Sequence, residues 1–230
     1  MSEPLIHADI AKAHTLPSRF YTDEDTFRSL ISRMQDCWYF GAHSSQFSEH
    51  NVIPLTDIET MLGEALMLTN SDEIRCLSNV CTHRGMLVAT EQSNRNTLQC
   101  RYHGRTFGID GCFKNMPEFQ DVEDFPSASE DLANFPVTDW KGLQLVGGDL
   151  YLKEAITELE SRLGWLDVDS FQHDPSRYRS YEIKANWALY VDNYLEGFHI
   201  PFVHGDLHDV LDKDEYLSLI HISEPTRPYW

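Results

Sequence analysis

Two short segments carry the residue types that bind iron. The first reads Cys81-Thr82-His83-Arg84-Gly85 and the second reads Cys100-Arg101-Tyr102-His103-Gly104, so the spacing is C-x-H, sixteen residues, then C-x-x-H. Two thiolates can hold one iron of a [2Fe–2S] cluster while two neutral imidazoles hold the other, and this mixture makes the cluster accept an electron more readily than an all-cysteine set does. The pattern predicts four cluster ligands, Cys81, His83, Cys100 and His103.

A structural zinc ion is the alternative for the same four residues. Zinc sites also use two cysteines and two histidines, but their pairs are usually C-x₂₋₄-C and H-x₃₋₅-H. Here each pair combines one cysteine with one histidine. The interleaved order favours the iron–sulfur cluster over zinc.

The residues around the two pairs resemble the Rieske domains of oxygenases and their ferredoxins. Rieske proteins of respiratory complexes carry an extra cysteine in each loop, whereas this chain has Met86 and Tyr102 at those places. Two positions depart from the oxygenase pattern: Arg101 stands where proline is common, and Arg105 stands where tryptophan is common. Neither is a ligand, so the cluster prediction is unaffected.

A second candidate metal site lies about a hundred residues further along, in the segment from Asp192 to His204. Its pattern E-x-x-H-x₄-H places Glu196 and His199 on one helix face. His199 and His204 are five residues apart, so a regular helix would point them in different directions. We expect the helix to break between them, with Pro201 placed to break it. The alternative is a helix end with two solvated or packed histidines.

Both motifs together resemble the alpha (catalytic) subunit of Rieske non-heme iron oxygenases, over roughly residues 35–216. The stretch from Asp192 to Tyr216 is most similar to the choline-monooxygenase-like, quaternary-amine subgroup. The resemblance implies that His199 and His204 bind a mononuclear Fe(II), with a later aspartate beyond the printed chain as third ligand. It also implies that Glu196 is the catalytic acidic residue linking this iron to the Rieske cluster of a neighbouring subunit.

The implied function is oxidation of a small organic substrate, an aromatic compound or a quaternary amine, by hydroxylation, demethylation or dihydroxylation. Electrons would come from NAD(P)H through a reductase, with or without a ferredoxin, and O₂ would be the co-substrate. The resemblance implies a homotrimer. The alternative is a Rieske electron-transfer protein without oxygenase activity, which would end near residue 150 and would lack the segment from Glu196 to His204.

The last residues have a different origin in our interpretation. The eleven residues from Leu217 to Arg227 are those that a widely used transposase sequencing adapter encodes when read in frame. We therefore expect genuine sequence to end near Tyr216, residues 217–230 to be an artefact, and the chain to be the front part of a larger enzyme that is inactive alone.

The composition limits which binding partners and which cellular compartment we expect for this protein. A net charge of −19, from 37 acidic and 18 basic residues, argues against nucleic acid and anionic membranes as partners. No secretory signal and no apolar stretch of transmembrane length is visible. The three remaining cysteines, at positions 37, 76 and 112, follow no pattern, so we expect reduced core residues in a cytoplasmic protein.

The expected fold class is α+β: the residue pattern predicts a small antiparallel β domain, and the resemblance implies that this is a Rieske domain followed by the truncated start of a helix-grip catalytic domain. We expect an N-terminal arm and helix over 1–36, the Rieske domain over 37–150 and the catalytic domain over 151–216. Apolar residues recur at helical spacing from Phe27 to Met34 and over 155–165. A helix is also expected over 187–200, and strands over 38–42, 65–68, 74–80, 97–100, 106–109, 112–113, 135–146 and 181–185.

Overall fold

The computed structural model describes residues 12, 14–148, 150–195 and 199–211. The chain divides into two compact units, one made of residues 31–178 and one made of residues 1–30 and 179–230. Glu196 and the expected adapter segment 217–230 lie outside the described residues.

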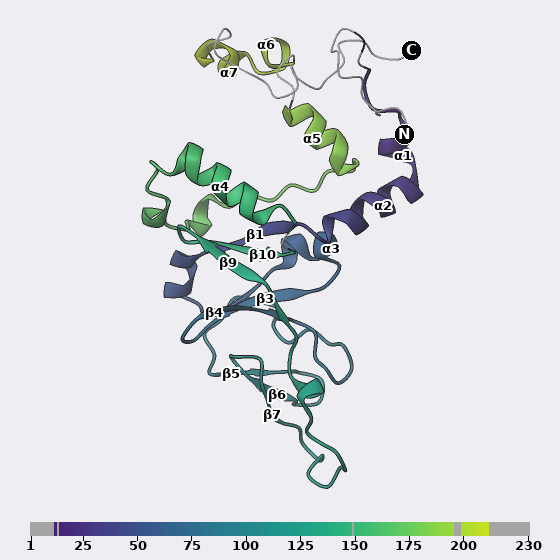
Figure 1. Cartoon of the computed structure of the whole chain (residues 1–230), viewed down its shortest axis with the longest axis vertical. Helices are drawn as coiled ribbons and strands as arrows, with labels where there is room; N and C mark the ends of the chain where they lie inside the picture. Colours follow the sequence, from purple (N-terminus) through teal and green to yellow (C-terminus); the bar gives the residue numbers. More distant parts are fainter. Residues whose placement is uncertain (1–11, 13, 149, 196–198, 212–230) are drawn as a thin grey trace. The chain divides into compact units, whose positions relative to one another are not determined.

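The larger unit contains three antiparallel sheets, which Figure 1 shows one below another. The first has the order β1 (Trp38–His43), β10 (Leu143–Gly147), β9 (Val137–Trp140). The second has the order β2 (Val52–Pro54), β3 (Leu66–Asn70), β4 (Ile74–Ser78), β8 (Asn134–Phe135). The third has the order β5 (Thr97–Gln99), β6 (Thr106–Gly108), β7 (Phe113–Asn115).

Strand β3 shows how these sheets share a core. Successive side chains of a strand point to opposite faces, and here both faces are buried: Leu66 and Leu68 join one apolar cluster while Met67 joins another. The cluster around Met67 also contains Leu98 and Phe107, which are fully buried in the third sheet. The third sheet, which follows one candidate ligand segment and contains the other, is therefore anchored to the centre of the unit.

Helix α4 (Leu152–Leu163) covers the first sheet through a third apolar cluster. Short 3₁₀ turns complete this unit: η2 (Ser44–Ser48), η3 (Thr56–Ile58), η4 (Ala128–Glu130), η5 (Val168–Ser170) and η6 (Pro175–Arg177), together with the one-turn helix α3 (Glu59–Leu62). The described part of the smaller unit is helical, with α1 (Arg19–Thr22), α5 (Trp187–Leu195), α6 (Ile200–Val203) and α7 (Gly205–Val210). Helix α2 (Glu24–Met34) runs across the division between the units.

The expected α+β class is confirmed, and most expected elements are present. Helix α2 contains the predicted apolar stripe from Phe27 to Met34, and at its start the Asp23 carboxylate accepts a hydrogen bond from the Thr26 backbone N–H at 2.8 Å. The three-residue strand β2 was not expected. It contains Pro54 and is recognisable only from its pairing, in which Val52 lies opposite Thr69.

Two expectations are wrong. Residues 181–185 alternate like a strand but form none in the structure, and Tyr181 and Ile183 are 80% and 57% exposed. Alternation alone does not make a strand, because its backbone groups need a hydrogen-bonding neighbour. Among the non-ligand cysteines only Cys76 is a core residue, and burial raises its pKa to about 12. Cys37 is half-buried and Cys112 is exposed, and both are free thiols.

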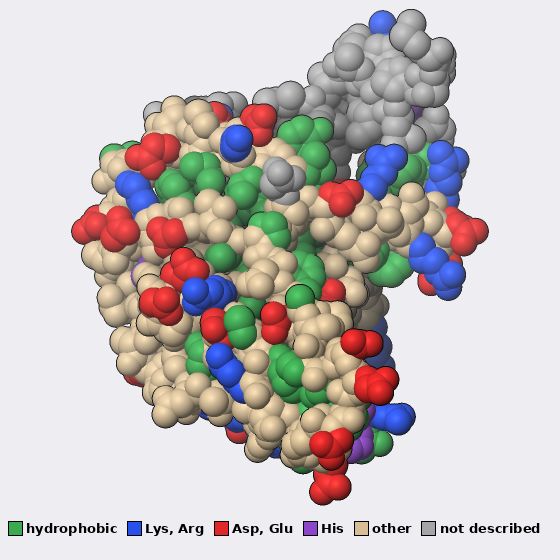
Figure 2. Space-filling view, turned by 60° about the horizontal axis from the view of Figure 1, so that its bottom comes forward, with side chains coloured by type: hydrophobic (Ala, Val, Ile, Leu, Met, Phe, Trp, Pro, Cys, Tyr) green, Lys and Arg blue, Asp and Glu red, His purple; other side chains and the backbone are tan. Residues whose placement is uncertain are grey.

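No helix among the described residues has both the length and the apolar character that crossing a bilayer requires. Acidic side chains are spread over the face seen in Figure 2, with basic ones among them. The excess negative charge is therefore distributed over that face and is not concentrated in one patch.

Candidate metal centres

The first candidate ligand loop follows strand β4. The backbone N–H of Cys81 donates to the Met86 carbonyl at 2.9 Å, and the N–H of Gly85 donates to the Cys81 carbonyl at 3.0 Å. Gly85 has φ +69°, a left-handed conformation that glycine adopts without the steric cost of a Cβ. The loop thus closes on itself at the cysteine.

The second candidate loop joins β5 to β6 and repeats this geometry. Here Cys100 N–H donates to the Arg105 carbonyl at 2.8 Å, Gly104 N–H donates to the Cys100 carbonyl at 3.1 Å, and Gly104 has φ +74°. The C-x-H and C-x-x-H segments are therefore held in equivalent turns. Each turn has its cysteine at the base, where the chain leaves the sheet.

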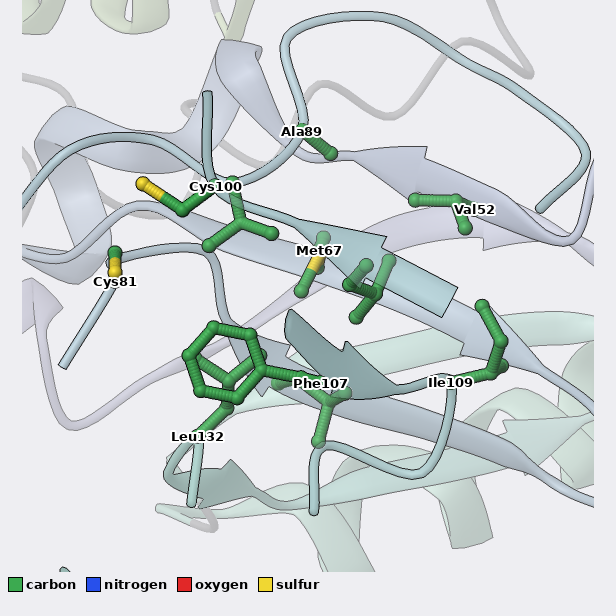
Figure 3. Close-up of a cluster of buried hydrophobic side chains, with 11 residues drawn as sticks. Val52, Met67, Cys81, Ala89, Cys100, Phe107, Ile109 and Leu132 are labelled. Carbon is green, nitrogen blue, oxygen red and sulfur yellow. The ribbon is translucent and has the colours of Figure 1, made fainter. Parts of the chain in front are cut away.

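The two cysteines meet inside the protein. Cys81 and Cys100 are 3% and 2% exposed and belong to the same buried cluster as Phe107 and Leu132. Figure 3 shows the side chains of Cys81 and Cys100 at one end of that cluster, with Val52 and Ile109 at the other end. The Cys100 thiol is near enough to raise the pKa of the Cys81 thiol. The structure therefore brings the two predicted sulfur ligands together.

Burial is the main cause of a raised pKa at the Cys81 thiol, and the neighbouring Cys100 thiol raises this pKa further. The backbone N–H groups of His83 and Arg84 act in the opposite direction, because they donate hydrogen bonds to the Cys81 sulfur. Such N–H donors stabilise a thiolate and influence the potential of a cluster bound to it. The loop backbone is thus suited to hold a negatively charged sulfur in an apolar surrounding.

The two histidines of these loops also lie together. The ring centroids of His83 and His103 are 4.8 Å apart with the planes at 70°. Tyr102 lies against the His103 ring at 3.8 Å, and Phe119 lies 5.9 Å from the His83 ring. His83 is half-buried and His103 is exposed. The imidazole pair is therefore closer to solvent than the cysteine pair.

The pKa of His83 is lowered, first by burial and then by the positive charges of His103, Arg84 and Arg105, while Glu130 opposes the shift. Each of these causes except Glu130 favours the neutral ring. A metal-binding imidazole must be neutral to offer its nitrogen lone pair. The surroundings of His83 therefore suit a ligand.

The donor set fits a [2Fe–2S] cluster, because the two cysteines share the buried core and the two histidine rings lie together nearer to solvent. A Rieske cluster needs two protein ligands for each iron, which matches one adjacent pair of thiols and one adjacent pair of imidazoles.

The second candidate site contains the pair His199 and His204. These residues flank the one-turn helix α6, and their ring centroids are 5.2 Å apart with the planes at 75°. His204 has non-helical backbone angles and is exposed, and it borders an open hollow with Asp206 and Leu207. The chain leaves the helical conformation at His204, and the two histidine rings lie close together although a regular helix would separate them.

The expected role of Pro201 is wrong. It lies in the first turn of α6, where proline is tolerated because its missing N–H would have no partner within the helix. The chain changes direction at His204, after α6 ends at Val203. Of the third predicted member of this site, Glu196, the structure gives no position because it lies outside the described residues.

Helix α5, which leads to the second pair, is attached to the N-terminal helix α1. The Tyr21 hydroxyl donates to the Asp192 carboxylate, and the Asn186 side-chain amide donates to the Tyr21 carbonyl at 3.1 Å. Nothing in the sequence pattern points to this contact, since Tyr21 and Asp192 are 171 positions apart. A contact of that separation leaves no local sequence pattern.

Comparison with known proteins supports both parts of the chain. Residues 37–126 match the family described as the Rieske [2Fe-2S] domain, and residues 172–221 match the ring hydroxylating alpha subunit (catalytic domain). The order of the two matches is that of an oxygenase subunit. The chain belongs to the Rieske oxygenase alpha-subunit family.

Curated relatives of this chain are named as monooxygenases of carnitine or choline, which are quaternary ammonium compounds. The carnitine monooxygenase oxygenase subunit of Escherichia coli (strain K12) is 28% identical, over 93% of this chain and 58% of its own length. The chloroplastic choline monooxygenase of Beta vulgaris is 27% identical, over 89% of this chain and 47% of its own length. This Rieske oxygenase chain thus spans about half the length of the curated relatives that it matches.

Solved structures agree with this membership. A quaternary ammonium Rieske monooxygenase, described for carnitine oxidation and inter-subunit electron transfer, is 25% identical with a TM-score of 0.74, over 88% of this chain and 56% of that one. Naphthalene 1,2-dioxygenase from Rhodococcus shares the fold at 23% identity, with a TM-score of 0.68 over 85% of this chain and 47% of that one. Because the relatives include chloroplast enzymes, the cytoplasmic location stays a prediction.

Proposed function

We propose that this protein is the catalytic alpha subunit of a Rieske monooxygenase that oxidises a quaternary ammonium compound. The observation that carries the proposal is the joint presence of two ligand sets in one chain, namely the paired loops at Cys81 and Cys100 and the histidine pair flanking α6. The substrate class rests on the carnitine and choline monooxygenases among its relatives. An aromatic substrate is the second candidate, supported by a shared fold alone.

In the proposed reaction one atom of O₂ enters a C–H bond of the substrate and the other leaves as water. NAD(P)H and one proton supply the two electrons and two hydrogens that this balance requires, through a reductase with or without a ferredoxin. When bound, the cluster would store one electron and the mononuclear iron would bind and activate O₂.

The residues of this chain would divide the work as follows. Cys81 and Cys100 would hold one iron of the cluster in the apolar interior, and His83 and His103 would hold the other near the surface, where an electron donor can approach. His199 and His204 would bind the mononuclear iron on one side. We assign Glu196 to the acidic link between this iron and the cluster of a neighbouring subunit in a homotrimer.

The division into a Rieske domain over 37–150 and the start of a catalytic domain over 151–216 is part of this proposal. The alternative function, a Rieske electron-transfer protein without oxygenase activity, would need only the first of these domains. The match of residues 172–221 to the catalytic domain of ring-hydroxylating alpha subunits favours the oxygenase.

The first test is reconstitution of the whole chain with iron and sulfide in the absence of oxygen. We expect two irons and two acid-labile sulfides per chain and the visible absorption of a [2Fe–2S] cluster. Zinc binding without sulfide would overturn the cluster assignment. Because iron and sulfide are counted directly, this result does not depend on turnover.

The second test uses a form extended to the length of its relatives. There, His199→Ala should lose the mononuclear iron and keep the cluster, while the exposed His173→Ala should keep both. Glu196→Ala should leave both metal sites loaded and stop NAD(P)H-dependent oxidation of carnitine or choline. Full turnover by Glu196→Ala would contradict the linking role, and oxidation of naphthalene but of neither amine would favour the aromatic substrate.

A further inference from the structure

Arg105 places a buried positive charge directly behind the second ligand loop. The residue is 3% exposed, and its guanidinium is paired with the carboxylate of Glu130, whose side chain is 20% exposed. Removing a cation from water is costly, so a buried arginine requires a partner and a well-shaped environment. A buried cation held in this way, next to a candidate ligand loop, calls for a functional explanation.

Three phenylalanines surround the guanidinium. Its Cζ lies 5.0 Å from the ring centroid of Phe113, 5.7 Å from that of Phe125 and 5.9 Å from that of Phe107. Cations are attracted to aromatic rings at such distances. The same apolar walls exclude water, so the field of the charge is screened less than at the surface.

The pair Arg105–Glu130 connects both ligand loops through the main chain. The Arg105 carbonyl accepts the hydrogen bond from Cys100 N–H that closes the second loop. The Glu130 carbonyl accepts a hydrogen bond from the Thr82 hydroxyl at 2.9 Å, and Thr82 stands between Cys81 and His83. One ion pair therefore spans the two segments that must be held in register for four ligands to meet.

The charge of Arg105 is only partly satisfied by hydrogen bonding. Its Nε is buried and has no hydrogen-bond partner among the described residues.

We infer that Arg105 is a positioning residue of the cluster site whose fixed positive charge raises the reduction potential of the cluster, and that Glu130 limits this effect. The inference rests on the proposed [2Fe–2S] function. Reduction adds one negative charge to the cluster, so a nearby cation stabilises the reduced form and a nearby anion destabilises it. Net charge near the cluster and hydrogen bonds to its sulfurs are established determinants of such potentials.

The test measures the reduction potential of the reconstituted whole chain by titration, at constant pH and ionic strength, for the parent and three variants. We expect Arg105→Gln to shift the potential to a more negative value and Glu130→Gln to shift it to a more positive one. Arg105→Lys keeps the charge and should remain closer to the parent than Arg105→Gln. Opposite signs are informative, because loosening of the site alone would not reverse with the sign of the removed charge.

Arg101→Gln is the matched control. Arg101 lies in the same ligand loop, but its side chain is 63% exposed and its ion pair with Glu91 is long, at 3.7 Å. Solvent and salt screen such a charge, so its removal should shift the potential less than removal of Arg105. Equal shifts for Arg101→Gln and Arg105→Gln, or shifts of the same sign for Arg105→Gln and Glu130→Gln, would overturn the inference.

Cluster content separates the outcomes. If the parent chain assembles no [2Fe–2S] cluster, the proposed function fails, and this inference fails with it. If Arg105→Gln alone loses the cluster, Glu130→Gln carries the test, since an unchanged or more negative potential in that variant would overturn the inference. An unchanged potential in an Arg105→Gln variant with full cluster content would overturn it directly.

Discussion

The two candidate metal sites of this chain differ in how their surroundings position them. The cysteines at 81 and 100 stand at the base of two hydrogen-bonded turns and are almost completely buried in a core shared by two sheets. The histidines at 199 and 204 flank a single helical turn, and His204 is exposed. The first site is organised by long-range packing, and the second pair is brought together by a local change of backbone direction.

This difference indicates which site the described residues can complete. All four predicted cluster ligands lie within one compact unit, in two adjacent pairs. The mononuclear site has two imidazoles within the described residues, whereas a facial site of this type uses two histidines and one carboxylate. We therefore expect the cluster to assemble in the present chain and the mononuclear iron to need the longer form.

The largest expected effect comes from removing a buried thiol. Cys81→Ser should abolish the [2Fe–2S] cluster, because a serine hydroxyl does not replace a thiolate ligand inside an apolar core. Visible absorption and acid-labile sulfide after anaerobic reconstitution measure this. Cys112→Ser is the control, since Cys112 is exposed and lies outside the predicted ligands, and it should keep the cluster. Retention of a full cluster in Cys81→Ser would refute the ligand assignment.

The second largest effect is expected on stability, because the two regions differ in how deeply their apolar side chains are buried. Leu98 is fully buried in the core beneath the cysteines, so Leu98→Ala should lower the free energy of unfolding by about 2–5 kcal/mol. Leu189 on α5 is 46% exposed, and Leu189→Ala should cost well under half of that. Urea unfolding followed by circular dichroism compares the two. Similar losses of unfolding free energy in the two variants would mean that both regions depend equally on buried apolar contacts, and the proposed contrast between them would be wrong.

The two ligand loops can be compared with each other through their glycines. Alanine at a left-handed position costs roughly 1–2 kcal/mol, so both Gly85→Ala and Gly104→Ala should destabilise the apo chain. A Cβ at Gly104 would meet Pro117 Cγ at 3.2 Å, whereas at Gly85 its nearest neighbour is 3.9 Å away. Gly104→Ala should therefore cost more, in the same unfolding assay. The reverse order would show that the second loop adjusts more easily than its contacts suggest.

The smallest effect is expected where one hydrogen bond joins the first loop to η4. Thr82→Val removes the 2.9 Å bond to the Glu130 carbonyl and should cost about 0.5–1.5 kcal/mol, near the lower limit because Thr82 is exposed. Thr90→Val, at another exposed threonine, is the control. A loss above that of Gly104→Ala would indicate that this single bond holds the loop more strongly than its geometry implies.

Much of the fold was predictable because its signals are local. The apolar spacing of α2 and the runs of β3 and β4 each lie within a few residues, and these elements are present. The strand expected at 181–185 failed for the complementary reason. Its alternation was real, but no neighbouring strand pairs with it among the described residues.

The sequence by itself determined the chemistry that this chain can offer: which thiols and imidazoles stand in pairs, and at what spacing. It also determined the α+β class, through periodicities read over short windows. Tertiary structure alone decided that the pairs converge, that Tyr21 contacts Asp192, and that the cation of Arg105 lies among three phenylalanines beside Glu130. The physical reason is that burial and the partner of a charge depend on residues brought together by packing, and separation along the chain carries no record of that proximity.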